Sequence, residues 1–167
     1  MTGFLLDTNV LSELRRPRPS PAVTAFLESQ REEDLFLSEV TFAEIRYGIE
    51  QLDDPERRAS IGAWLDHTLR PLFEGRTLPV SEDVLLRWRL QIEAGRRRGH
   101  TFGQPDLLIA ACAAESGLIV VTRDTTHFVA ARVAVLDPWN ASFTGPDGRQ
   151  VEVEDMTRPD LLGSLAI

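Results

Sequence analysis

Four carboxylates occupy positions at which they could share one metal ion: Asp7, Glu44, Asp106 and Asp124. Asp7 closes the apolar run 4–6, and Asp124 follows the apolar run that begins at Ile119. Each run has the length and composition of a short buried strand. The carboxyl ends of strands in an open parallel sheet form the edge where ligands bind. The other two acids lie on segments with helical patterns that should pack near this edge, and such a group suits metal-assisted hydrolysis.

Mutual repulsion makes a group of four acids costly unless something neutralises it. Two carboxylates about 5 Å apart repel by roughly 3 kcal/mol at an effective dielectric constant of 20. Protons or a cation would relieve this repulsion, and hard divalent cations take oxygen ligands. The three histidines and the single cysteine show no zinc-binding spacing: His67, His100, His127 and Cys112. Mg²⁺, or alternatively Mn²⁺, is therefore the predicted ion.

Each acid also has an ordinary structural role open to it. Asp7 can cap a helix that begins at Thr8, and Asp124 can form a turn. Asp106 suits the first turn of a helix, where the helix dipole favours an acid. Glu44 can be a solvated helix residue, since it lies off the apolar stripe of its segment. Only the joint placement of the four acids favours a metal-binding catalytic site.

The elements that must position these acids alternate between short strands and helices, a pattern typical of a parallel sheet covered on both faces. The predicted strands cover residues 4–6, 35–37, 76–80, 119–122 and 133–136. The predicted helices cover residues 8–16, 21–29, 39–52, 55–69, 81–95 (or 81–99) and 105–116. The last helix is apolar nearly all round and should be central. The predicted fold class is α/β, a three-layer α/β/α arrangement with a central, mostly parallel sheet.

The chain changes character near its C-terminus. Residues 1–140 are predicted to form the folded domain, with 133–136 as the last strand of its sheet. In the C-terminal extension, residues 141–167, a turn at Gly145–Gly148 and the alternation of valines with acids indicate a small hairpin. The end of the chain, 155–167, is predicted to be a mobile tail.

Composition narrows the classes of function. The formal net charge of −8 argues against a protein that coats nucleic acid by bulk attraction. It still allows an enzyme that meets a phosphate backbone through a cation and a few arginines. All 18 basic residues are arginine. The absence of lysine excludes a P-loop, a Schiff base, haloacid-dehalogenase-type phosphatases and response-regulator receivers, because each of them uses a lysine.

Cysteine use and hydropathy indicate a cytoplasmic protein. The single cysteine, Cys112, lies in an apolar helical segment and is predicted to be a small buried hydrophobe. No disulfide within the chain is possible, which agrees with a reducing cytosol. The sequence shows no signal peptide and no apolar run long enough to span a membrane.

Four ordered motifs resemble those of PIN-domain ribonucleases, and most closely the VapC/FitB-type toxins of bacterial type II toxin–antitoxin pairs. The motifs are LLDTNV at 5–10, LSEVTFAEIRYG at 37–48, DLLIAA at 106–111 and TRDTTHF at 122–128. The resemblance covers about residues 3–140 and implies a PIN-like fold.

The resemblance also implies roles for individual residues. The acids at the family's catalytic positions are Asp7, Glu44, Asp106 and Asp124, and the three aspartates among them would bind the metal. Three polar residues fall on positions that support the acids: Thr8, Asn9 and Thr122. Gln104 and Pro105 depart from the pattern, because they are bulkier and stiffer than the small residues expected before Asp106, and they could alter access to the site.

The activity that the resemblance implies is metal-assisted hydrolysis of single-stranded or loop RNA, leaving a 5′ phosphate. The aspartates would bind the cation directly or through water, while Glu44 would complete the site or orient the attacking water. Two arginine clusters could hold flanking phosphates, although solvated surface arginines are the commoner interpretation. These clusters are Arg15, Arg16 and Arg18, and Arg96, Arg97 and Arg98.

The implied partners are a second copy of the chain in a homodimer and a tightly bound antitoxin whose C-terminal segment covers the site. DNA would be bound only through the antitoxin. Two other classes stay open: a catalytically silent PIN-like module that binds a protein partner, and a metal-dependent phosphatase for small molecules. An open groove at the acids favours RNA, whereas a deep pocket of nucleotide size favours the phosphatase.

Overall fold

A computed structural model describes residues 3–165, apart from the side chain of Gln104, and its strands form one sheet in the order β3-β2-β1-β4-β5-β6-β7. The strands are β1 (Phe4–Leu6), β2 (Leu35–Ser38), β3 (Thr77–Leu78), β4 (Ile119–Val121), β5 (Val135–Asp137), β6 (Ser142–Thr144) and β7 (Gln150–Glu152). Strands β1 to β5 pair in parallel, and β6 and β7 are antiparallel. The predicted mostly parallel sheet is confirmed.

Helices connect the strands and cover the sheet. They are α1 (Thr8–Leu14), α2 (Pro21–Ser29), α3 (Glu39–Glu50), α4 (Pro55–Trp64), α5 (Arg70–Leu72), α6 (Glu82–Arg97), α7 (Gln104–Ser116), α8 (Thr125–Ala130) and α9 (Leu161–Leu165). A 3-10 turn, η1 (Glu32–Asp34), precedes β2, and a π-helical turn, η2 (Leu65–Leu69), joins α4 to α5. Among the described residues, no helix is both long enough and apolar enough to cross a membrane.

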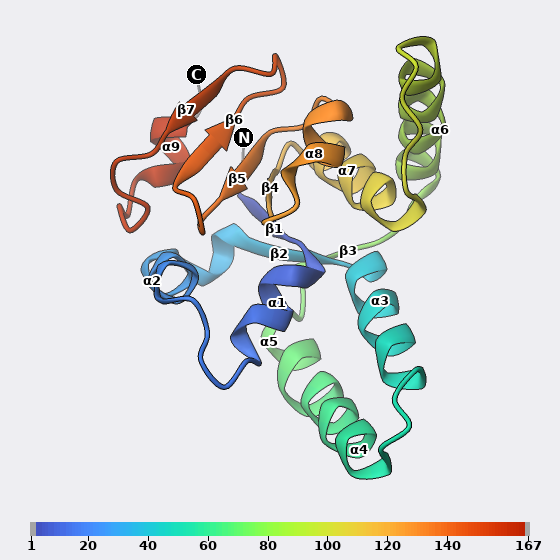
Figure 1. Cartoon of the computed structure of the whole chain (residues 1–167), viewed down its shortest axis with the longest axis vertical. Helices are drawn as coiled ribbons and strands as arrows, with labels where there is room; N and C mark the ends of the chain where they lie inside the picture. The colour runs from blue at the N-terminus through green and yellow to red at the C-terminus, as the bar shows by residue number, and fades with distance from the viewer. Residues whose placement is uncertain (1–2, 166–167) are drawn as a thin grey trace.

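Alternation of side chains along the central strands divides the core into two layers. In β1, Phe4 and Leu6 join one buried cluster while Leu5 joins the other, as the period of a strand requires. The first cluster includes residues of α1, α2, η2 and α9, and the second includes residues of α6, α7 and α8. Helices therefore lie on both faces of the sheet, which confirms the three-layer α/β/α arrangement (Figure 1).

Parallel pairing brings the ends of β1 and β4 together. Leu6 is in register with Val121, and the backbone N–H of Asp7 donates to the carbonyl of Val121 at 3.0 Å. Asp7 also caps α1, and Ser38 at the end of β2 caps α3 by accepting from the N–H of Thr41. The strand ends and the helix starts thus meet at one edge of the sheet.

The C-terminal segment contains the predicted hairpin, in which the turn at Gly145–Gly148 joins β6 to β7, but it differs from the prediction in two other respects. Strand β5 is not the last strand, because β6 pairs with it antiparallel and β7 pairs with β6 as a hairpin. Instead of a mobile tail, residues 155–165 pack against the first core cluster through buried Met156, Leu161 and Leu165. The sequence prediction gave too little weight to four apolar residues in these positions, Met156, Leu161, Leu162 and Leu165. Residues 166 and 167 of that predicted tail lie outside the described residues.

Candidate active site

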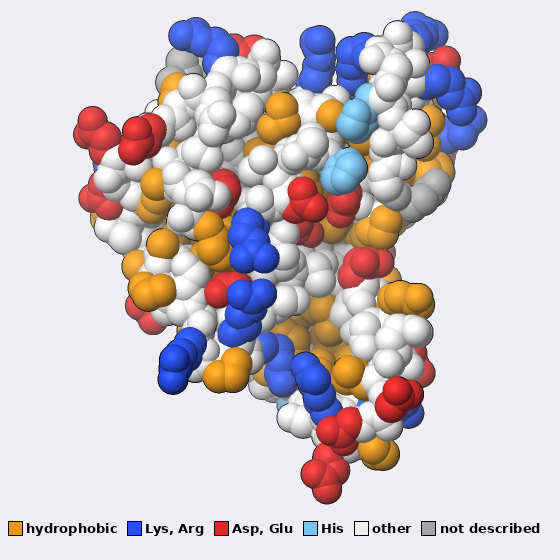
Figure 2. Space-filling view, viewed as in Figure 1, with side chains coloured by type: hydrophobic (Ala, Val, Ile, Leu, Met, Phe, Trp, Pro, Cys, Tyr) orange, Lys and Arg blue, Asp and Glu red, His pale blue; other side chains and the backbone are white. Residues whose placement is uncertain are grey.

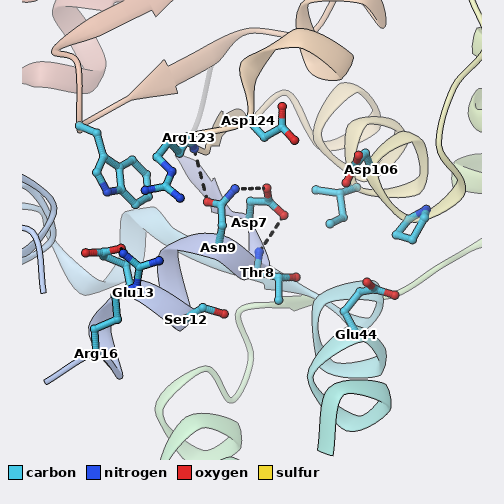
Figure 3. Close-up of a pocket in the computed structure, with 13 residues that line it drawn as sticks. Asp7, Thr8, Asn9, Ser12, Glu13, Arg16, Glu44, Asp106, Arg123 and Asp124 are labelled. Carbon is cyan, nitrogen blue, oxygen red and sulfur yellow. Dashed lines mark hydrogen bonds and ion pairs between the residues drawn. The ribbon is translucent and has the colours of Figure 1, made fainter. Parts of the chain in front are cut away.

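The four predicted carboxylates line one pocket of about 310 Å³. Asp7 follows β1, Asp124 follows β4, Asp106 lies in the first turn of α7, and Glu44 lies on α3. In Figure 3, Asp7, Asp106 and Asp124 gather in the upper part of the pocket, while Glu44 lies at its edge on α3. Residues from four elements are therefore assembled as expected, whereas their catalytic roles stay a prediction.

Asp7 is held through both carboxylate oxygens. Oδ1 accepts from the backbone N–H of Thr8 at 2.7 Å. Oδ2 accepts from the Thr122 hydroxyl at 2.7 Å and from the Asn9 amide at 3.0 Å. The Asn9 amide and the backbone N–H of Asp124 both donate to the Thr122 hydroxyl, at 2.8 and 3.1 Å. The predicted supporting residues thus fix the orientation of Asp7 and link the ends of β1 and β4.

Burial and neighbouring charges disfavour ionisation of Asp7. Its side chain is nearly inaccessible, and desolvation is the largest cause that raises its pKa from 3.8 to about 6. The hydrogen bonds from Thr122 and Thr8 lower this pKa, while the charges of Asp106 and Asp124 raise it. Desolvation also raises the pKa of Asp106. The three aspartates therefore offer oxygen ligands that repel one another, and such a set of ligands fits a hard divalent cation.

The spacing of the carboxylates indicates whether they would bind an ion directly or through water. Within residues 3–165, no group of three or more His, Cys, Asp or Glu side chains is arranged to hold a metal ion by itself. Asp124 is exposed and Glu44 is half-buried, so both side chains have room to change rotamer. Mg²⁺ usually keeps several waters and takes one or two carboxylates. The residues therefore fit a hydrated cation held partly through water.

The pocket is also lined by residues that sequence reasoning did not single out. They are Ser12, Glu13, Ile109, Arg123 and Trp139. The Arg123 guanidinium lies over the Trp139 ring, 5.7 Å from its centroid, and its backbone N–H donates to Asn9 at 3.4 Å. Helical spacing could have identified two of them, because Ser12 and Glu13 follow Asn9 by one turn of α1 and so lie on the same side of that helix.

A buried acid positions one of the predicted arginines. Glu13 is 5% exposed, accepts from the backbone N–H of Ser20 at 2.8 Å, and pairs with Arg16 at 3.1 Å. These contacts fix the loop between α1 and α2 and keep Arg16 in the pocket wall. Pro105, which departs from the family pattern, lines the pocket beside Asp106 at the start of α7. The side chain of Gln104 is outside the described part of the chain.

The remaining predicted arginines lie elsewhere. Arg15 stacks over Trp64 at 4.7 Å, in a groove beside the pocket, and Arg18 is exposed on the loop after α1.

The cluster at the end of α6 does not line the acidic pocket. Arg96 and Arg97 lie 3.8 and 3.7 Å from Glu93, and Arg98 donates to the carbonyl of Ala130 at 2.9 Å. Within the described part of the chain, Arg16 is the one predicted arginine of the six that lines the acidic pocket.

The pocket continues into a larger groove of about 690 Å³ between α1, α3 and α4. Four residues line both cavities: Thr8, Ser12, Arg16 and Glu44. The walls of the groove combine apolar side chains with cations: Leu11, Ile45, Ile49, Leu52, Ile61, Trp64, Arg15, Arg16 and Arg57. Figure 2 shows arginine side chains running away from the central acidic patch on this face. The acids therefore lie at one end of an open groove.

Comparison with known proteins agrees with this geometry. The family model described as PIN domain matches residues 4–134. The chain belongs to the PIN-domain family. This PIN-domain chain is 40% identical over 137 residues to Toxin FitB of Neisseria gonorrhoeae, and the match covers 82% of the chain and 99% of the relative. It is 36% identical over 136 residues to VapC ribonuclease Y4jK of Sinorhizobium fredii, covering 81% and 97%.

Solved structures of similar chains share the fold. The crystal structure of FitAcB from Neisseria gonorrhoeae contains a chain 40% identical to this one, with a TM-score of 0.77, covering 81% of this chain and 98% of that one. A structure of FitAB bound to an IR36 DNA fragment gives a TM-score of 0.76 at 39% identity, covering 81% and 95%. The resemblance to VapC/FitB-type toxins is thereby confirmed.

Proposed function

We propose that this PIN-domain chain is the toxin of a type II toxin–antitoxin pair and hydrolyses RNA phosphodiester bonds with the help of a metal ion. The convergence of Asp7, Glu44, Asp106 and Asp124 on one pocket is the observation that carries the proposal. The relatives named as a toxin and as a VapC ribonuclease support it, because they are similar to the chain over about four fifths of its length.

The three aspartates would hold Mg²⁺, or Mn²⁺ in its place, partly through water. Such an ion, when bound, lowers the pKa of a water and offsets charge on the phosphoryl oxygens. The chain itself fixes Asp7 through Thr122, Asn9 and Thr8, so the carboxylate need not reorganise during the reaction. Ordered donors of this kind keep the ligand oriented and tune its basicity.

Glu44 and the arginines would act on the other reacting groups. Glu44 is half-buried at the edge of the pocket, where it can orient a water or accept its proton. Arg16 and Arg123, which line the same pocket, would contact phosphates flanking the scissile one.

The shape of the site favours RNA over a small phosphate ester. The acids open into a groove rather than a closed pocket of nucleotide size, so a polymer can extend beyond the reacting group. A catalytically silent module is disfavoured by the four acids, since a binding surface has no need for a buried carboxylate whose pKa is raised to about 6.

The groove also suits the antitoxin. Its apolar walls can bury one face of an amphipathic segment, and its acidic end can accept a cationic side chain from that segment. Similar chains are found in the structures of FitAcB and of FitAB bound to an IR36 DNA fragment, which supports this part of the proposal. DNA binding would come through the antitoxin. A homodimer is proposed as well, and the exposed leucines of α6 offer apolar surface for it: Leu85, Leu86 and Leu90.

The test is induction of the chain alone in a bacterial host, with RNA ends mapped, beside Asp7→Asn and the exposed control Asp53→Asn. We expect growth arrest and new RNA ends with the wild type and the control, and neither with Asp7→Asn. The purified protein should cut the mapped sequence in Mg²⁺ and not in a chelator. Arrest that persists undiminished in Asp7→Asn, without new RNA ends, would refute the proposal in favour of toxicity by binding.

A further inference from the structure

A second cavity, of about 370 Å³, lies between α6 and α7. Trp88, Ile92 and Arg96 of α6 form one wall, the loop 99–103 forms another, and Leu107 of α7 closes it. This cavity and the acidic pocket share no lining residue, and the proposed hydrolysis does not involve the cavity. Its volume lies within the usual range for small-molecule sites.

The loop that shapes this cavity is held in a defined conformation. Gly99 has a φ of +73°, which ends α6 in the left-handed region, and the N–H of His100 then donates back to the carbonyl of Gly95 at 2.9 Å. Phe102 packs directly on Gly95, since a Cβ at that position would lie 2.2 Å from the Phe102 ring. A backbone hydrogen bond and a close contact of the Phe102 ring therefore hold the loop against Gly95 of α6.

The cavity walls combine aromatic faces with unused polar atoms. Trp88, His100 and Phe102 line it, and the His100 and Phe102 rings meet edge to face at 4.5 Å. Trp88 Nε1 and His100 Nε2 are buried and have no hydrogen-bond partner among the described residues. Buried polar atoms are nearly always paired, so each of these atoms lacks a partner that a water or a bound molecule can supply. The indole N–H can only donate, whereas His100 Nε2 donates or accepts according to its tautomer. A nucleobase carries donors and acceptors on its edge, together with a face that stacks on aromatic rings.

The cavity adjoins the acids. Gly103 lines it, and a Cβ on Gly103 would lie 3.7 Å from Asp106 Oδ2. Leu107, the next residue after Asp106, lines it from the helix side. The ring of His100 lies 6.1 Å from that of His127, and Figure 2 shows histidine side chains directly beside the acidic patch. A nucleotide whose phosphate meets the acids could therefore place its base here.

We infer that the α6–α7 cavity is a nucleobase subsite for a nucleotide adjacent to the scissile phosphate. The inference rests on the proposed ribonuclease function. Trp88 and His100 recognise the base by stacking and by the polar atoms they leave unpaired, and Arg96 at the rim contacts the attached phosphate or the base edge. The subsite gives the enzyme a preference for particular bases beside the cleavage point, which the acids alone cannot provide.

The test uses the indole N–H signals of Trp64, Trp88 and Trp139 in the NMR spectrum of the full chain without metal. Trp88→Phe assigns the Trp88 signal. On titration with AMP, GMP, CMP and UMP, at least one nucleotide should shift this signal more than the other two indole signals. Ribose 5-phosphate, which lacks a base, should leave it in place.

Two pairs of variants control for indirect effects. Arg96 and Arg97 are both exposed and both contact Glu93, but Arg96 alone lines the cavity, so Arg96→Gln should weaken nucleotide binding and Arg97→Gln should not. His100→Ala should weaken it by roughly 5- to 140-fold, the range for loss of one stacking partner, while the exposed His67→Ala leaves it unchanged. In RNA cleavage, Arg96→Gln and His100→Ala should raise KM for the preferred sequence.

Three results would overturn the inference. In the first, the nucleotides leave the Trp88 signal unmoved at millimolar concentration. In the second, ribose 5-phosphate moves it as much as AMP does. In the third, the signal responds to protein concentration rather than to nucleotide, which would assign the cavity to contact with a second copy of the chain. The ribonuclease proposal fails on a different result, which is RNA that stays intact in Mg²⁺. The indole signals are recorded without metal and do not depend on cleavage, so the two failures are distinguishable.

Discussion

At the scale of single residues, the chemistry of the site depends on two opposing effects on the charge of Asp7. The residue is buried beside two other acids, which disfavours its charge, yet three donors are aimed at its oxygens, which favours that charge. Desolvation is the larger effect, so the buried carboxylate carries its charge poorly. Binding of the proposed cation should therefore be coupled to release of a proton.

Replacing Asp7 by Asn should stabilise the metal-free protein at neutral pH. The pKa of Asp7 is about 6 in the folded chain and 3.8 when unperturbed, so ionisation favours unfolding. Below about pH 4 the carboxyl is protonated in both states and has no such effect. Between pH 4 and 6 the destabilisation grows, reaching at most about 3 kcal/mol above pH 6. Thermal unfolding across this range, with a chelator, measures the difference between wild type and Asp7→Asn.

The same experiment in Mg²⁺ supplies the complementary result. The ion should raise the unfolding temperature of the wild type and leave that of Asp7→Asn nearly unchanged, and the wild-type gain should fade as pH drops through about 6. A variant that is less stable than the wild type at pH 7.5 without metal would contradict this account of Asp7.

The Thr122 hydroxyl should matter to activity although it need not touch the substrate. It donates to Asp7 and accepts from Asn9 and from the backbone of Asp124, so Thr122→Val removes a central link. Loss of a residue that orients a metal ligand typically lowers metal affinity or activity by about 10- to 100-fold. Cleavage rates at several Mg²⁺ concentrations measure this effect. Thr122→Ser should restore most of the activity, and the exposed Thr126→Val should be neutral; equal losses in all three variants would refute the assignment.

At the scale of elements, local sequence patterns predict the parts of the site that local interactions build. The apolar runs before Asp7 and Asp124 are strands, and the acids do follow their carboxyl ends. The bond between Thr122 and Asp7 joins residues 115 positions apart, so only the family resemblance marked Thr122 as a supporting residue. The cavity between α6 and α7 was not predicted, because it depends on how a loop packs rather than on residue spacing.

A glycine in α6 should be required for the geometry of that loop. A Cβ on Gly95 would meet the Phe102 ring at 2.2 Å, so Gly95→Ala should displace Phe102 and cost about 1–3 kcal/mol of unfolding free energy. Gly62 in α4 has open space around its Cβ position, and Gly62→Ala should be neutral or stabilise by up to about 1 kcal/mol. Chemical denaturation of the two variants measures the contrast, and an equally stable Gly95→Ala would show that the loop yields easily.

At the scale of the whole molecule, the C-terminal segment completes the core on the face that carries α1 and α2. Leu161 is 1% exposed within that cluster, so Leu161→Ala should cost about 2–5 kcal/mol in denaturant unfolding. Val151→Ala, at an exposed position of β7, should cost less than about 1 kcal/mol. If Leu161→Ala were as mild as the control, the segment would be dispensable to the fold, as a mobile tail would be.

The distribution of charge over the molecule determines how RNA binding should respond to salt. The net charge is −8, and only a few arginines lie near the acids, so bulk attraction contributes little. Two or three phosphate contacts, from Arg16, Arg123 and Arg96, predict a slope of log affinity against log salt between about −1.4 and −2.1 for single-stranded RNA. Fluorescence anisotropy of an uncut oligonucleotide on Asp7→Asn measures it. The Arg16→Gln, Arg123→Gln double variant should flatten the slope by about 1.4, whereas a slope steeper than about −4 would mean that an extended basic surface binds the RNA.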